Sequence, residues 1–151
     1  LQYADKAYKL NKSDLDNLET ALFANFLNGE FDATHELILE ASKLRFDSKR
    51  ITSANNALEF VRSNSIFPAE FLKLQDTAYS LLHSSNIFIM KPTLTICEDE
   101  DSIFLSYEIL LDKPVSEIVD LSVMLAEALA QEPSLNDISG KINISFSPWC
   151  D

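Results

Sequence analysis

The chain has 151 residues, of which 46% are hydrophobic, and its formal net charge is −12 at pH 7. A chain of this size and apolar content can bury a substantial core, so we expect one folded domain over residues 1–151. The charge is uneven, because residues 86–151 carry 12 acidic and 3 basic side chains, a net of −9. A negative field of this kind repels nucleic acids and anionic membranes and attracts basic proteins. The composition therefore argues against nucleic-acid binding and favours a basic protein partner.

Glycine is too scarce for the familiar phosphate-binding loops. Gly29 and Gly140 are the two glycines, and they stand alone, whereas loops that cradle phosphates use clustered glycines. The sequence also lacks the G-x-S-x-G and H-E-x-x-H motifs of nucleophilic and metal-dependent hydrolases. We therefore expect no catalytic residues, no cofactor and no enzyme activity.

Histidine and cysteine are too scattered for a zinc site, which needs about four ligands close together. His35 and His83 belong to separate predicted helices, Cys97 ends the first predicted strand and Cys150 follows the third. We expect no metal centre. A single bridge between the two cysteines and a pair of reduced thiols both remain open.

No apolar run approaches the roughly 18 residues that a membrane span requires, and no signal peptide is visible. We therefore expect a soluble, cytoplasmic protein without membrane contact. The chain begins at Leu1 rather than at methionine, so a removed signal remains open.

Residues 1–86 are predicted to form the helical half of the chain. It begins with a weakly helical segment at residues 2–10, and four amphipathic helices follow. Ser13 with Asp16 resembles a capping box and predicts a helix that ends at Asn28-Gly29. Asp32 is the predicted cap of the second helix, and Thr52 or Ser53 opens the third. The fourth helix begins at Pro68 and ends before residues 84–86.

The loop between the second and third predicted helices carries a basic cluster formed by Lys43, Arg45, Lys49 and Arg50. It has two interpretations. The cluster binds a phosphate or an acidic peptide, or it complements the helix dipole and lines a solvated loop.

From residue 87 the hydrophobic period changes to two, which is typical of strands. Residues 102–111 form the central predicted strand, after a strand at residues 93–97 and before a helix that ends near Gln131. A last alternating run covers residues 141–146. The sequence therefore predicts an α+β fold, with a helical half at residues 1–86 and a small ββαβ sheet unit at residues 87–151. One face of the central strand is apolar, through Ile103, Leu105, Tyr107, Ile109 and Leu111.

The helix before Gln131 is apolar around most of its circumference, which is typical of a helix buried on two sides. One side can pack on the sheet. We expect the N-terminal helices to cover the other side, and this is the argument for a single domain.

Two surfaces of the sheet unit are candidates for binding. The first is the acidic turn at residues 98–101, which is either a solvated hairpin turn or a contact surface for a basic partner. The second is the predicted polar face of the sheet, which can remain solvated or can dock a partner. Its residues are Thr93, Thr95, Ser106, Glu108, Asn143 and Ser145. Trp149 near the C-terminus is either an aromatic anchor for a partner or a clamp for its own chain end.

These observations lead to the hypothesis of a non-catalytic acidic protein-binding module, an inhibitor or immunity-type protein that engages a basic partner. The alternatives are a secretion-type chaperone that uses the sheet edge, and a small-ligand sensor or enzyme with a dispersed carboxylate site. The sequence does not fix the partner or the oligomeric state. The predicted partner-binding residues are Glu98, Asp99, Glu100, Asp101, Glu108 and Trp149.

Overall fold

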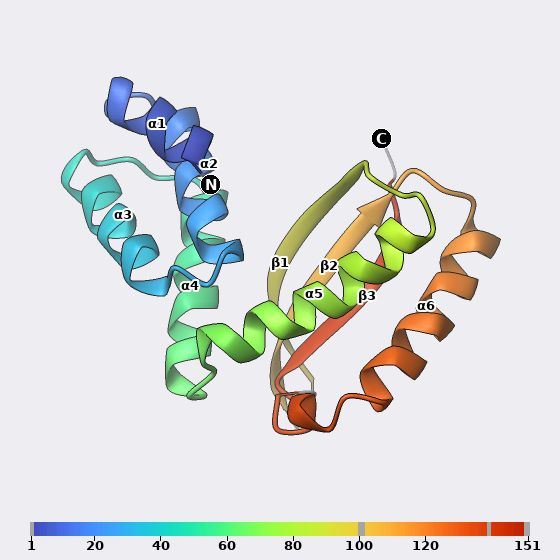
Figure 1. Cartoon of the computed structure of the whole chain (residues 1–151). Coiled ribbons are helices and arrows are strands. Elements are labelled where there is room, and N and C mark those ends of the chain that lie inside the picture. Colours follow the sequence, from blue (N-terminus) through green and yellow to red (C-terminus); the bar gives the residue numbers. More distant parts are fainter. Residues whose placement is uncertain (1, 100–101, 139, 150–151) are drawn as a thin grey trace. The chain divides into compact units, whose positions relative to one another are not determined.

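The computed structural model describes residues 2–99, 102–138 and 140–149 (Figure 1). Its helices and single sheet form an α+β fold, as the sequence predicts. The chain divides into two compact units, Leu1–Leu72 and Lys73–Asp151, and the division falls within α5. The elements are α1 (Gln2–Leu10), α2 (Leu15–Leu27), α3 (Phe31–Lys43), α4 (Lys49–Ser63), α5 (Pro68–Ser84), β1 (Met90–Glu98), β2 (Ile103–Leu111), α6 (Val115–Ala130), the 3-10 helix η1 (Pro133–Leu135) and β3 (Ile142–Pro148).

This division assigns most of α5 to the same unit as the sheet. The sequence predicted instead that the boundary between the two halves lies between residues 86 and 87. The reason is visible in the contacts of α5, because its Tyr79 packs against Tyr107 of β2. The first turn of α5 belongs to the helical unit instead. That the whole chain behaves as one domain remains a prediction.

The helical unit is built around an aromatic cluster. The ring of Phe26 lies 5.4 Å from that of Phe31 and 5.4 Å from that of Phe71, the latter edge-on. Leu22 and Leu18, one and two turns earlier in α2, are completely buried. The predicted i, i+3, i+4 pattern of α2 therefore does face a core.

Three helix starts differ from the sequence prediction. Asp14, not Ser13, caps α2 and accepts a hydrogen bond from the backbone N–H of Asn17 at 3.1 Å. Helix α3 begins at Phe31 without a side-chain cap, because Asp32 lies inside the first turn and pairs with Arg62. Helix α4 begins earlier than predicted, where Ser48 accepts from the N–H of Ile51. At α2 the two candidate caps, Ser13 and Asp14, are adjacent, and local sequence does not choose between them.

The sheet has the order β1-β2-β3, with β1 antiparallel and β3 parallel to β2. This confirms the predicted ββαβ unit. Pro92 lies in the edge strand β1, where the lack of a backbone N–H is tolerated. The apolar side of β2 is completely buried from Leu105 to Leu111 at alternate residues, but Ile103 at the strand start is 56% exposed. The neighbouring strands add apolar side chains to this same face of the sheet, opposite the buried residues of β2. They are Leu94, Ile96, Ile142, Ile144 and Phe146.

Both helices of the Lys73–Asp151 unit cover this buried face. The hydroxyl of Tyr79 on α5 shares a hydrogen bond with that of Tyr107. Leu74 of α5 and Leu129 of α6 together line a cavity of about 200 Å³ whose other wall includes Ile142 and Ile144. The sheet is therefore covered on one side by the helices of its own unit.

Helix α6 is buried along one side only within its unit, through Ile118, Leu121 and Leu125. The sequence predicted burial on two sides. A three-stranded sheet with both helices on one face has a single apolar layer, so it offers α6 a single contact surface. Coverage of the second side by the N-terminal helices remains a prediction.

The two glycines give a direct test of the α2–α3 turn. Gly29 has φ +71°, and a Cβ added there would lie 3.2 Å from Cβ of Pro68, whereas a Cβ at Gly140 would meet nothing within 4 Å. We expect Gly29→Ala to destabilise the helical unit by about 1–2 kcal/mol. Gly140→Ala should stay within about 0.5 kcal/mol of the parent. Urea unfolding of both variants checks this, and equal losses would contradict it.

The tyrosine pair predicts sensitivity to alkali. Burial raises the pKa of both Tyr79 and Tyr107 above the ordinary value of 10. Above pH 10 the unfolded chain releases these protons while the folded chain keeps them, so stability present below pH 10 falls as pH rises, by up to about 1.4 kcal/mol per pH unit for each tyrosine. Urea unfolding between pH 9 and 11 should show a shallower loss in the Tyr79→Phe, Tyr107→Phe double variant. An unchanged slope would argue against the buried pair.

Candidate functional site

The face of the sheet opposite α5 and α6 is the outer sheet face. The register places small polar side chains in rows across it: Thr93, Glu108 and Ser145 form one row. None of its side chains is buried, and no helix of its unit lies over it. The polar grouping predicted from alternation is therefore confirmed. The full set is Lys91, Thr93, Thr95, Cys97, Phe104, Ser106, Glu108, Leu110, Asn143, Ser145 and Ser147.

Glu108 is the acidic residue at the centre of this face. Ser147 donates a hydrogen bond to Glu108 Oε1, and Thr93 Oγ1 donates to the Glu108 backbone carbonyl at 3.4 Å. Oε2 accepts no hydrogen bond from the described residues, so one carboxylate oxygen stays available. The side chain is thus oriented by its neighbours and presents a fixed negative charge outward.

Trp149 continues β3 onto the same face. Its backbone N–H donates to the Leu111 carbonyl at 2.8 Å, and Lys91 Nζ lies 5.8 Å from the centre of its ring. The residue is 37% exposed. Trp149 therefore pins the chain end to its own sheet and still leaves ring surface for a partner, so both interpretations from the sequence have a structural basis.

The acidic turn is less uniform than its sequence suggests. Asp99 Oδ1 accepts from the backbone N–H and the hydroxyl of Ser102, at 2.8 and 2.9 Å. Asp99 therefore builds the turn. Glu98 is exposed at the end of β1. Glu100 and Asp101 lie outside the described residues.

The predicted partner-binding residues do not form one patch. The acidic turn precedes Ile103 at the start of β2, whereas Trp149 lies beside Leu111 at its end. Nine strand residues separate the two, which corresponds to roughly 27 Å. Glu108 and Trp149 share the outer sheet face, and Glu98 and Asp99 lie at the far end of the sheet.

Sequence reasoning missed one exposed surface. Val115, Val119 and Val123 are 64%, 55% and 55% exposed, on a helix that the sequence predicted to be buried on two sides. Their spacing of four residues was a usable signal, because it differs from the Ile118, Leu121, Leu125 set that packs on the sheet.

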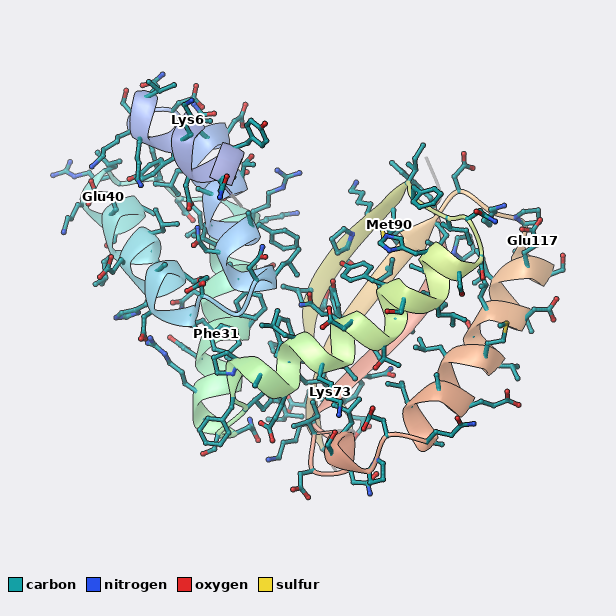
Figure 2. All side chains as sticks on the ribbon, in the orientation of Figure 1. Lys6, Phe31, Glu40, Lys73, Met90 and Glu117 are labelled. Carbon is teal, nitrogen blue, oxygen red and sulfur yellow. The ribbon has the colours of Figure 1, made fainter. Side chains whose placement is uncertain are left out.

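The lysines of the sheet unit are largely occupied by internal partners. Lys73 Nζ lies 2.8 Å from Glu132 Oε1 and 2.7 Å from the Ser134 hydroxyl (Figure 2). The hydrogen bond from Lys73 lowers the pKa of Glu132. Lys113 pairs with Glu117 at 3.1 Å. Because the acidic residues of the unit outnumber its basic ones 13 to 4, most carboxylates have no cation of their own.

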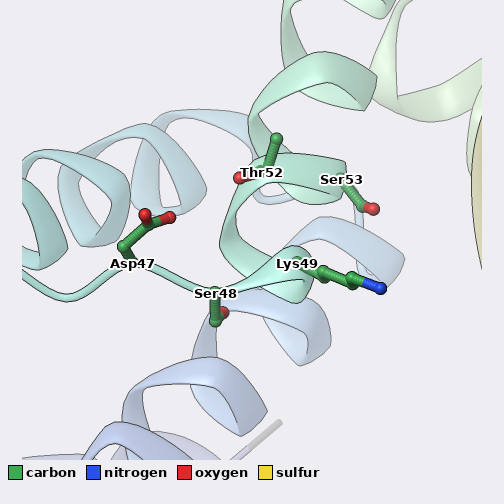
Figure 3. A pocket seen from close by; sticks show the side chains of 5 residues that line it. All are labelled: Asp47, Ser48, Lys49, Thr52 and Ser53. Atoms are coloured by element: carbon green, nitrogen blue, oxygen red, sulfur yellow. The ribbon is translucent and has the colours of Figure 1, made fainter.

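The basic cluster of the helical unit is dispersed. Lys43 pairs with Glu40 at 3.8 Å and Arg50 with Glu19 at 3.5 Å. Lys49 borders an open depression at the start of α4 (Figure 3). The two ion pairs favour the structural interpretation of the cluster. The depression is lined by Asp47, Ser48, Lys49, Thr52 and Ser53.

A deeper polar groove lies between α1 and α3, with a volume of about 350 Å³. Asn25 on α2 is 4% exposed and donates to Asp5 Oδ1 and to the Ala21 carbonyl, both at 2.8 Å. Burial, and then the nearby Glu40 carboxylate, raises the pKa of Tyr8. The lining side chains are Asp5, Tyr8, Lys9, Lys12, Asn25, Ala33, Glu36, Leu37 and Glu40.

No known protein family, curated protein or solved structure matches this chain. Within residues 2–99, 102–138 and 140–149, no group of three or more His, Cys, Asp or Glu side chains is arranged to hold a metal ion. In the same residues no helix has the length and apolar character needed to cross a bilayer.

The contact between Lys91 and Trp149 can be tested with the single tryptophan as reporter. We expect Lys91→Ala to increase acrylamide quenching of Trp149 fluorescence, because the ring loses its cover, and to cost about 0.5 kcal/mol of stability. Lys73→Ala, on the helix that covers the opposite face, is the control and should leave quenching unchanged. Equal quenching in the parent and the Lys91 variant would show that the contact is absent in solution.

Proposed function

We propose that this chain is a non-catalytic acidic protein-binding module that engages a basic partner, as an inhibitor or immunity-type protein does. The observation that carries the proposal is the outer sheet face, which presents Glu108 and Trp149 and has no covering helix in its own unit. Sheet faces left open in this way are suited to docking another surface.

The charge balance supports the same proposal. Of the 17 charged residues in residues 73–151, 13 are acidic, which gives this unit a net charge of −9. A field of that size accelerates encounter with a basic protein and discriminates against acidic ones. A chaperone that adds a partner strand at a sheet edge is a variant of this proposal, since β1 and β3 are both edge strands of the three-stranded sheet.

Charge variants test the proposal in a pull-down from source lysate at low and high salt, with partners identified by mass spectrometry. We expect one basic protein to be retained at low salt and released at high salt. Glu108→Lys on the outer sheet face and Glu98→Lys at the acidic turn should each weaken its binding by about threefold or more. Glu59→Lys on α4, in the helical unit, is the control, since it changes net charge as much as Glu108→Lys does.

If Glu59→Lys weakens binding as strongly as Glu108→Lys, net charge rather than the outer sheet face is responsible. If no basic protein is retained at low salt, the proposed function is wrong.

A small-ligand sensor is a second candidate, favoured by the groove between α1 and α3. Its volume of about 350 Å³ falls at the lower end of the range for small-molecule sites, and polar groups converge in it. A thermal-shift screen of metabolites tests this candidate. A ligand that stabilises the parent chain but not Tyr8→Phe or Glu40→Gln would support it, with Tyr3→Phe on the exposed side of α1 as control.

A further inference from the structure

Helix α6 presents an apolar surface that its own unit does not use. We define the α6 stripe as Val115, Val119, Val123, Ala126 and Ala130, all of which are exposed. Successive members are three or four residues apart, so their side chains lie in one row along the helix. Over fifteen residues of α-helix this row is about 22 Å long.

The α6 stripe is separate from the side of α6 that packs on the sheet. The buried side consists of Ile118, Leu121 and Leu125. At 100° per residue, Val119 and Val123 lie more than 90° around the helix from the centre of that side. A row of apolar side chains at i, i+4 and i+8 is the pattern by which one helix recognises another.

One flank of the α6 stripe is acidic. Asp120 and Glu127 lie on this flank of the helix circumference, beyond Ser116, and Glu117, labelled in Figure 2, lies further around. Glu117 pairs with Lys113, whereas Asp120 and Glu127 have no basic partner within the described residues. Helix α6 itself contains no basic residue. An occupant therefore meets an apolar row with negative charge along one flank.

We propose that the α6 stripe docks an amphipathic helix of the partner protein, with an apolar face flanked by lysine or arginine. This inference rests on the proposed function, and it adds a second contact surface, on the opposite side of the sheet from the outer sheet face, and the chemistry of the partner segment that binds there. Charge complementarity decides the occupant, because a second copy of this chain would bring Asp120 and Glu127 against the same acidic residues.

A synthetic peptide of about 18 residues serves as the probe, with leucines on one helical face and lysines on both flanks. A second peptide has the same composition but leucines distributed around the helix. Calorimetry on the full chain should show that the first peptide binds at least tenfold more tightly. Val119→Ser with Val123→Ser should abolish that preference. Ile103→Ser is the control, since Ile103 is 56% exposed but lies on β2.

The outcomes separate the two proposals. Equal, salt-sensitive binding of both peptides would overturn the α6 inference and leave the acidic binding module intact. Failure of the chain to bind either peptide, together with no basic protein retained from lysate, would overturn both. A dimer in sedimentation velocity that Val119→Ser with Val123→Ser dissociates would assign the α6 stripe to a second copy and overturn the inference. Circular dichroism of each variant confirms that the fold is kept.

Discussion

Side chains on a strand alternate between two faces, and this constraint determines most of the sheet unit. When Leu105, Tyr107 and Ile109 are buried under α5 and α6, Ser106 and Glu108 must point the other way. The hydrogen bond between Tyr79 and Tyr107 then fixes α5 over the buried side. A slip of the register by one residue would bury Glu108 and expose Tyr107, so the core and the outer sheet face are specified together.

The same alternation explains what the sequence could predict. The ββαβ order, the buried row of β2 and the polar row with Thr93 and Ser145 all follow from a period of two. The caps could not be predicted as well, because Ser13 and Asp14 are adjacent and both are suitable. The role of Asp99 in building its turn was hidden within a run of four acidic residues.

The exposure of α6 was missed for a different physical reason. Periodicity reports which residues of a helix are apolar, but it does not report how many layers of structure are available to cover them. The Lys73–Asp151 unit supplies one apolar layer, and Ile118, Leu121 and Leu125 occupy it. A helix that is apolar around most of its circumference is therefore either covered by a second layer of structure or exposes a docking surface. Sequence alone does not distinguish these two cases.

The exposed valines have no explanation in the stability of α6 itself. Valine is a weaker helix former than alanine, lysine or glutamate, because its branched Cβ restricts χ1 against the preceding turn. An exposed valine also leaves apolar area in water, so Val119 and Val123 gain little from the fold to offset that preference. A helix shaped only by its own unit would favour polar helix formers at these positions. The row of valines beside Asp120 and Glu127 is instead consistent with a surface that is covered when a basic helix binds.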